Sequence, residues 1–298
     1  MTNSSASSAG LVLSSALARP SMAPRVEIEG LTLAYGRQPV LQGLQWRLEP
    51  GQVVGLLGRN GAGKTTLLEA MLGLRDTSAG SVKLFGQPAT QLDDATRARI
   101  GYVPQQGDLF EELRADELLA YFRSFYPRWN EAKVQGLLQR WAVPRGIPIG
   151  RMSGGQQQRL SLIRALAHEP ELLVLDEPVA SLDPLARRDF LRELVEQVLD
   201  RGTTVVFSTH ILSDLERVAF NVAFLQGGRI ALQSPLDELL DETRLLVGPE
   251  ALLAALSGVE VLSRRPGRWL VRRIDEAALA PGLAAQRANL EDLFEALA

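Results

Sequence analysis

The feature that most constrains the fold is a strand-like run that leads into a glycine-rich loop and then into a helix. Residues 52–57 form a short apolar run typical of a buried strand, residues 58–63 are rich in glycine, and residues 65–74 have a helical pattern. This order begins an α/β unit built on a parallel sheet. The chain has 298 residues, 46% of them hydrophobic, which is enough for one large domain with an appendage or for two small domains.

The glycine-rich loop also indicates a chemistry. Residues 58–65 read Gly-Arg-Asn-Gly-Ala-Gly-Lys-Thr and match the phosphate-binding P-loop pattern G-x-x-x-x-G-K-[ST]. The glycines let backbone N–H groups turn toward phosphate oxygens, and the start of the helix adds the positive end of its dipole. Since a strand precedes the loop and a helix follows it, a chance glycine turn is disfavoured. The residues expected to contact a nucleotide here are Gly58, Asn60, Gly61, Ala62, Gly63, Lys64, Thr65 and Thr66.

Two of these residues have specific expected roles, and a second segment supplies acids. The Lys64 ammonium is expected to reach the β- and γ-phosphates, and the Thr65 hydroxyl to ligate Mg²⁺. The apolar run of residues 172–175 ends in Asp176 and Glu177. Nucleotide sites of open α/β sheets lie at such carboxyl ends of strands. Asp176 is therefore expected to hold Mg²⁺ and Glu177 to polarise an attacking water, the alternative being a strand that ends in exposed acids.

Composition excludes several other classes of protein. The absence of cysteine excludes disulfides, cysteine-ligated zinc, iron–sulfur clusters and thiol catalysis, and it fits a reducing cytoplasm. His168 and His210 are the only histidines, so a histidine-rich metal site is excluded. His168 ends a predicted helix, where the helix dipole favours a cationic imidazole, and we expect no catalytic role for it. The formal net charge of −3 argues against a protein that coats nucleic acid.

A third motif brings in a resemblance to a known family. Residues 153–156 read Ser-Gly-Gly-Gln, and Ser153 is a good N-cap for a helix over residues 156–168. Together with the motifs above, this segment makes residues 26–235 resemble the ATP-binding cassette (ABC) ATPases, although Met152 replaces the leucine usual in the family. The resemblance implies an α/β P-loop NTPase fold: a parallel core sheet, an antiparallel β subdomain and a helical subdomain. It also implies that two cassettes sandwich two ATP molecules.

The resemblance implies further site residues. Ser153, Gly154, Gly155 and Gln156 would contact the ATP held by the P-loop of the second cassette, most simply another copy of this chain. Tyr35 would stack on adenine, unless it is a core tyrosine at a strand end. Gln105 would touch Mg²⁺ and the attacking water, although the adjacent Gln106 leaves room for a slip by one residue. Asp183 would lie in the loop that crosses the dimer interface, and His210 would sense the γ-phosphate.

Changes in composition divide the chain into three parts. Residues 1–24 are rich in serine and alanine and are expected to form a disordered tail, with Met22 as a possible alternative start. Residues 25–235 are assigned to the nucleotide-binding domain. Residues 236–298 are expected to form a small α+β appendage, with a hairpin around Pro266 and Gly267 and a final helix over residues 290–297.

What the ATPase drives follows from the same resemblance. No run approaches the ~18 apolar residues that a membrane span needs, so a transporter of this kind requires a separate integral membrane permease. Residues 107–125 occupy the segment that meets the permease in related proteins. Phe110 and Tyr121 would contact it there, unless they pack the helical subdomain instead. The short appendage and residues 125–129 resemble bacterial drug, lipid or polysaccharide exporters of the ABC-2/multidrug type, which sit at the cytoplasmic face of the bacterial membrane. The predicted function is ATP hydrolysis that energises export.

Two alternatives stay open. One is an importer ATPase subunit, although sugar-importer ATPases usually carry a longer regulatory domain. The other is a non-transport ABC ATPase that acts on nucleic acid or the ribosome. An arginine-rich hairpin over residues 264–273 is the one feature that favours this alternative, and neighbouring acids such as Glu260 and Asp275 make a solvated face the simpler interpretation. No nucleic-acid partner is therefore expected.

Overall fold

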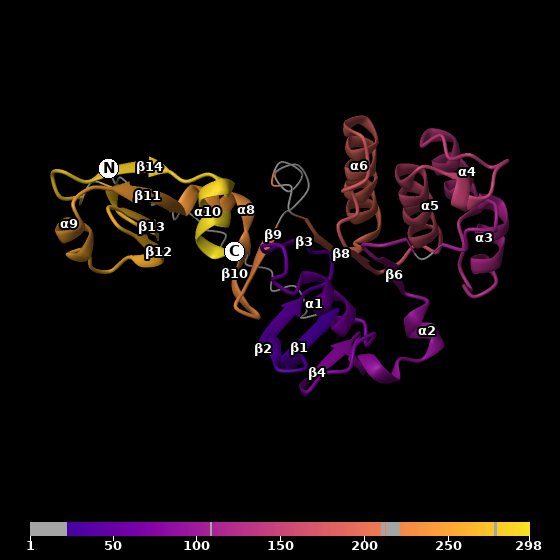
Figure 1. Ribbon diagram of the computed structural model, residues 1–298, viewed down its shortest axis with the longest axis horizontal. Coiled ribbons are helices and arrows are strands. Elements are labelled where there is room, and N and C mark those ends of the chain that lie inside the picture. The colour runs from indigo at the N-terminus through magenta and orange to yellow at the C-terminus, as the bar shows by residue number, and fades with distance from the viewer. Residues whose placement is uncertain (1–22, 108, 210–211, 213–220, 277–278) are drawn as a thin grey trace, which may run out of the picture.

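The computed structural model describes residues 23–107, 109–209, 212, 221–276 and 279–298. Almost all of the predicted tail, together with His210, lies outside these residues. The described elements form three groups along the long axis of the molecule, with a helical group at one end, sheets in the middle and the C-terminal elements at the other end (Figure 1). In this part of the chain, no helix combines the length and apolar character that crossing a membrane requires.

The central sheet confirms the predicted parallel core. Its strand order is β10-β9-β3-β8-β7-β6, in which β10 alone runs antiparallel to its neighbour. Strands β3, β7, β8 and β9 read as nearly continuous apolar runs because both faces of the sheet are covered. The strands are β3 (Val53–Leu57), β6 (Ile100–Val103), β7 (Leu172–Leu175), β8 (Thr204–Ser208), β9 (Asn221–Gln226) and β10 (Arg229–Pro235).

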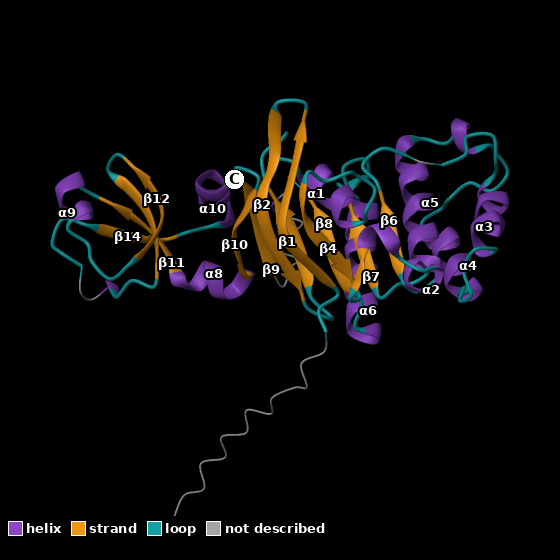
Figure 2. Ribbon diagram, turned by 90° about the horizontal axis from the view of Figure 1, so that it is seen from below, coloured by secondary structure: helices purple, strands orange, loops and turns teal. Residues whose placement is uncertain are grey.

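Side chains of these strands alternate between two hydrophobic clusters, one on each face. Leu57 and Phe207 belong to the cluster that contains helices α5 (Gly154–Ala167) and α6 (Pro184–Arg201). Leu56 and Val206 belong to the cluster on the other face. That cluster contains α1 (Lys64–Met71) and the antiparallel sheet, so the core sheet is sandwiched between layers of different kinds (Figure 2).

Two subdomains complete the expected cassette. The antiparallel sheet has the order β2-β1-β4-β5, and the helical subdomain lies beyond β6. Elements of the first are β1 (Val26–Tyr35), β2 (Gln38–Leu48), β4 (Ala79–Leu84), β5 (Gln87–Pro88), the 3₁₀ turn η1 (Ala89–Gln91) and α2 (Asp94–Arg97). Elements of the second are α3 (Ala115–Arg123), α4 (Glu131–Arg140) and the 3₁₀ turn η2 (Ile149–Arg151).

The C-terminal residues form the expected α+β unit around a second antiparallel sheet, with the order β12-β13-β11-β14. The hairpin of β12 and β13 turns at Pro266 and Gly267, as predicted, whereas β11 and β14 emerge only from the structure. Its elements are α8 (Leu236–Glu242), β11 (Thr243–Val247), α9 (Glu250–Ala254), β12 (Glu260–Arg265), β13 (Arg268–Arg272), β14 (Ala284–Arg287) and α10 (Leu290–Leu297).

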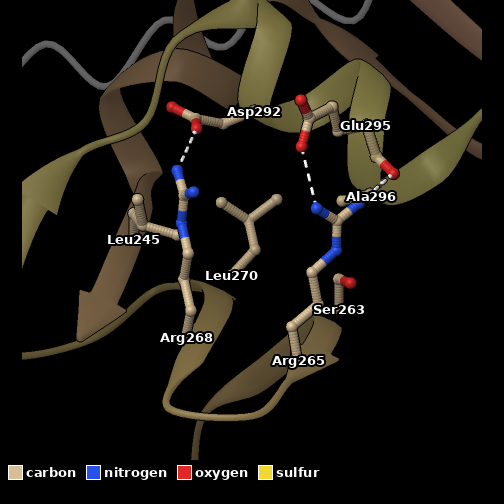
Figure 3. Close-up of a pocket in the computed structure, with 8 residues that line it drawn as sticks. All are labelled: Leu245, Ser263, Arg265, Arg268, Leu270, Asp292, Glu295 and Ala296. Atoms are coloured by element: carbon tan, nitrogen blue, oxygen red, sulfur yellow. Dashed lines mark hydrogen bonds and ion pairs between the residues drawn. The ribbon is translucent and has the colours of Figure 1, made fainter. Parts of the chain in front are cut away.

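The arginine-rich hairpin forms ion pairs within its own domain. Arg265 pairs with Glu295 at 2.8 Å and Arg268 with Asp292 at 2.9 Å, so both arginines hold helix α10 (Figure 3). Arg272 is buried and lies 2.6 Å from Glu242. Because each of these guanidinium groups has an acidic partner, they form no unopposed cationic face for a polyanion.

His168 differs from its sequence-based interpretation. It is the C-cap of α5, but its side chain is only 1% exposed and its ring stacks on Tyr126 with centroids 4.1 Å apart. Its Nε2 atom lies 3.1 Å from the carbonyl oxygen of Ile100. Burial lowers the pKa of His168 from the usual 6.5 to about 4, so the imidazole is neutral at pH 7. The expectation of a cation favoured by the helix dipole is therefore wrong, because desolvation outweighs the dipole.

This burial predicts a loss of stability in mild acid. In the unfolded chain the His168 imidazole is protonated below about pH 6.5. In the folded chain the same imidazole stays neutral down to about pH 4. The folded state thus binds fewer protons in this window, and its stability falls as the pH falls. Between about pH 7 and pH 5 the wild type should lose about 2 kcal/mol more unfolding free energy than His168→Gln in urea titrations. Tyr126→Phe keeps the histidine and the ring stacking and should follow the wild type; equal losses in His168→Gln and wild type would contradict the prediction.

Candidate functional site

A cavity of about 500 Å³ lies where the P-loop, β1, β2 and the carboxyl end of β7 meet. This position, at the ends of parallel strands, is the one expected for a ligand site in an open α/β sheet. Residues from several separate segments therefore line one cavity. Its lining residues are Tyr35, Gln38, Val40, Asn60, Gly61, Gly63, Lys64, Thr65, Thr66, Gln105, Asp176 and Glu177.

The P-loop connects β3 to α1, and its glycines are required by the backbone. Gly61 and Gly63 have φ angles of +80° and +98°, which L side chains rarely adopt. A Cβ atom on Gly63 would also lie 2.7 Å from Cγ1 of Val40, which leaves no room for a side chain. Gly63 is the N-cap of α1, and no described side chain caps this helix. The first N–H groups of α1 are thus left for an anion in the cavity.

Lys64 crosses this loop to the acids of β7. Its Nζ donates a hydrogen bond of 2.8 Å to the carbonyl oxygen of Gly58 and lies 3.9 Å from Oε1 of Glu177. Burial lowers the pKa of Lys64, while the charges of Glu177 and Asp176 act in the opposite direction. The buried ammonium lacks the hydration that it would have in water. Negatively charged phosphate oxygens in the cavity could replace that hydration by accepting its hydrogen bonds.

Asp176 and Glu177 follow β7 and differ in their surroundings. Asp176 is fully buried; its Oδ1 accepts a 2.5 Å hydrogen bond from the Ser208 hydroxyl, whereas its Oδ2 is buried and has no hydrogen-bond partner in the described chain. Glu177 is 8% exposed and has a φ of +48°, in the left-handed region. Its backbone N–H donates to Ser208 Oγ at 2.8 Å. The alternative of a strand that ends in exposed acids is therefore wrong, because both acids are buried and line the cavity.

The structure also distinguishes between alternatives for Tyr35 and Gln105. The Tyr35 side chain is 50% exposed and lines the cavity, so it is not a core residue; its hydroxyl lies 3.3 Å from Thr66 Oγ1. Gln105, rather than Gln106, lines the cavity. Its Oε1 accepts a long hydrogen bond of 3.5 Å from the Thr65 hydroxyl.

The serine-glycine segment lies elsewhere. The Ser153 hydroxyl accepts from the Gln156 N–H at 3.3 Å, and Oε1 of Gln156 accepts from the Ser153 N–H at 2.9 Å, which forms a capping box at the start of α5. Neither these residues nor Gly154 and Gly155 are among the described residues that line the cavity.

Asp183 is also engaged within the chain. Its Oδ1 accepts from the backbone N–H groups of Leu185 and Ala186 at 3.0 Å each, and its Oδ2 pairs with Arg159 at 2.6 Å. Asp183 does not line the cavity of its own chain either. A single chain thus brings together the P-loop and the acids, and leaves Ser153, Gly154, Gly155, Gln156 and Asp183 apart from them.

Sequence reasoning missed Ser208. The residue stands at the end of β8, which pairs in parallel with β7 in a register that matches Leu175 with Phe207. A polar residue at the end of an apolar strand was the available signal, but the neighbour it contacts depends on strand order, which the sequence does not display.

Curated relatives match nearly the whole chain. The sequence pattern of the family described as "ABC transporter" matches residues 41–180. The chain is 36% identical to the Nod factor export ATP-binding protein I of Rhizobium etli, over 90% of this chain and 92% of the relative. It is 35% identical to the protein of the same name from Rhizobium meliloti, over 96% of this chain and 91% of the relative.

Solved structures agree with the sequence comparisons. An "ATP binding subunit of ABC transporter" is 29% identical with a TM-score of 0.66, and it covers 72% of this chain and 92% of its own. A bacterial Atm1-family ABC exporter with ATP bound is 26% identical with a TM-score of 0.64, over 73% of this chain and 40% of the exporter. With the P-loop, the buried acids and the three-part cassette in place, the chain belongs to the ABC transporter family as one of its ATPases.

Proposed function

We propose that this protein hydrolyses ATP to energise export through a separate integral membrane permease, at the cytoplasmic face of a bacterial membrane. The observation that supports this most is the cavity in which Lys64, Asp176 and Glu177 converge beside the P-loop. Its relatives are named as export ATP-binding proteins, which favours export over import. The hairpin arginines with acidic partners favour neither nucleic acid nor the ribosome as a partner.

Phosphoryl transfer to water needs positioning and charge neutralisation more than covalent chemistry. Glu177 orients the water and accepts its proton, while Lys64 and the N–H groups of the P-loop hold the phosphates. Tyr35 stacks on the adenine from the exposed end of β1. Gln105 and His210 fix the geometry of the γ-phosphate.

The residues also fit a Mg²⁺ ion. Oδ2 of Asp176 is a buried carboxylate oxygen with no hydrogen-bond partner among the described residues. The Thr65 hydroxyl and the Gln105 amide oxygen lie next to each other at the same cavity. Hydroxyl, amide and carboxylate oxygens are ligands that suit Mg²⁺, with phosphate oxygens completing its shell. When bound, Mg²⁺ supplies neutralisation of the phosphate charge, and Thr65, Gln105 and Asp176 are the residues that would hold it.

A second copy of the chain would complete the site. Ser153, Gly154, Gly155 and Gln156 form a helix start that lies outside the chain's own cavity. A Cβ atom on Gly154 would meet no described atom within 4 Å, so the surface there is open to a ligand held by a partner. In a homodimer these residues would close over ATP bound to the other P-loop, and Asp183 would lie in the loop between the two sites.

The face that meets the permease is proposed to be an aromatic cluster formed by Phe110, Tyr121, Phe122 and Phe125. The Tyr121 ring lies 5.6 Å from that of Phe110 and 5.1 Å from that of Phe125, measured between centroids. Phe110 is 45%, Tyr121 47% and Phe125 60% exposed. Aromatic side chains that gather on a surface are typical of the centre of a protein–protein interface.

The test is to pull down the tagged protein from solubilised native membranes and to identify the co-purifying proteins by mass spectrometry. A polytopic membrane protein that co-purifies without a solute-binding protein supports export, whereas a solute-binding protein in the complex indicates import.

The double variant Phe110→Ser, Phe125→Ser should no longer bind the permease. The ATPase activity of the purified protein should be unchanged within about twofold, because the cluster lies away from the cavity lining. Leu74→Ser, which alters an exposed leucine elsewhere, is the control and should keep the permease. Ribosomes or DNA-associated proteins in place of a permease would contradict the proposal.

A further inference from the structure

We infer that Ser208 is a positioning residue for hydrolysis: its hydroxyl decides which oxygen of Asp176 faces the cavity and holds the backbone of Glu177 in place. This inference rests on the proposed ATP hydrolysis at the P-loop cavity. It concerns a residue whose hydroxyl is hydrogen-bonded to Asp176 and to the backbone of Glu177, and that acts through these two acids after β7.

The directions of the two hydrogen bonds are fixed by chemistry. The backbone N–H of Glu177 can only donate, so Ser208 Oγ accepts this 2.8 Å bond. The one proton of the hydroxyl is then free to go to Oδ1 of Asp176, 2.5 Å away, because an ionised carboxylate only accepts. Ser208 is fully buried, so water does not compete for either bond.

The first bond selects an oxygen of Asp176. With Oδ1 held toward β8, Oδ2 is the carboxylate oxygen that has no hydrogen-bond partner among the described residues. Asp176 lines the cavity, so Oδ2 is the atom available to a cation that accompanies the phosphates. Without the serine, the carboxylate could turn about its χ2 torsion and present either oxygen.

The second bond holds a strained turn. Glu177 has a φ of +48°, a conformation that a glutamate adopts only when its surroundings impose it. The turn is fixed from both neighbouring strands: the Asp176 N–H donates to the carbonyl oxygen of Val103 on β6 at 2.9 Å, and the Glu177 N–H donates to Ser208 at the end of β8. The sheet thus fixes the backbone position from which the Glu177 side chain extends.

The test compares variants in both binding and turnover. Ser208→Ala and Ser208→Cys remove the strong hydroxyl donor at nearly unchanged volume, and Ser208→Thr keeps it. The matched control is Thr203→Val, which removes the buried hydrogen bond from Thr203 Oγ1 to the Pro170 carbonyl oxygen near the opposite end of β8. We measure kcat and KM for ATP, the affinity for Mn²⁺ with a non-hydrolysable ATP analogue by electron paramagnetic resonance, and ATP affinity in EDTA.

We expect Ser208→Ala and Ser208→Cys to lower kcat and Mn²⁺ affinity by about tenfold or more, the effect of losing a hydrogen bond to a charged group. ATP affinity in EDTA should change by less than about twofold, since the P-loop is untouched. Ser208→Thr should keep kcat and Mn²⁺ affinity near the wild-type values. Thr203→Val should lower thermal stability and leave both of these quantities unchanged. Unchanged kcat and Mn²⁺ affinity in the alanine and cysteine variants, or equal losses in Thr203→Val, would overturn the inference. Failure of the wild type to bind ATP would instead overturn the proposed function, so the two failures are distinguishable.

Discussion

Glu177→Gln should lower steady-state ATP hydrolysis by about 10²–10⁴-fold, the range that a positioned general base contributes, while ATP still binds. Glutamine has nearly the same shape, so the left-handed backbone at residue 177 and its hydrogen bond to Ser208 are retained. What is lost is the ability to accept a proton from water. Phosphate release measured under saturating ATP, together with filter binding of labelled ATP, checks both halves of the prediction.

The same variant should accumulate as an ATP-bound dimer. If the serine-glycine segment of one chain closes over the ATP of the other, a complex that cannot hydrolyse its ATP has no route to separation. Size-exclusion chromatography with ATP and Mg²⁺ should then show dimers for Glu177→Gln and monomers when ATP is left out. Glu291→Gln removes an exposed carboxylate from α10 and should behave as the wild type. Monomeric Glu177→Gln with saturating ATP would count against the homodimer, and retained hydrolysis would count against Glu177 as the base.

The sequence predicted the local parts of this site well. The P-loop is a contiguous motif, so its loop, Gly61, Gly63 and Lys64 are found together at the cavity without any knowledge of long-range packing. The apolar runs that form β3 and β7 were also predicted as strands, because parallel strands buried on both faces contain few polar residues. Acids that follow such a strand then lie where the sheet places them.

Features that depend on neighbours across the fold were not predicted. Ser208 contacts Asp176 because β8 lies next to β7, and strand order is a global property. His168 was assigned from its place at a helix end, whereas its burial, with the Tyr126 ring stacked on the imidazole, lowers its pKa. The short strands β11 and β14 carry too few alternating residues to signal a strand until they pair with each other.

Lys64→Met should raise the dissociation constant for ATP by about tenfold or more, since hydrogen bonds to charged phosphates are lost. It should also lower kcat by about 10²–10³-fold, the effect of removing a donor that meets developing negative charge. Methionine keeps most of the apolar stem of lysine, so packing against the loop is largely preserved. Lys83→Met is the matched control: Lys83 lies exposed on β4, and its replacement should change neither quantity.

Lys64→Met should leave the empty protein at least as stable as the wild type and make the ATP-bound protein less stable than the wild type. Burial lowers the pKa of Lys64 despite the nearby charges of Glu177 and Asp176, so folding makes its ammonium less favourable than it is in water. In the empty protein the variant should therefore unfold at the same temperature as the wild type or at a higher one. With saturating ATP and Mg²⁺ the order should reverse, because the ligand stabilises only the protein that binds it tightly. Thermal unfolding of both proteins with and without ATP checks this reversal. A variant that is less stable than the wild type in both conditions would show that Lys64 maintains the empty fold, and that its charge is not held there for the phosphates.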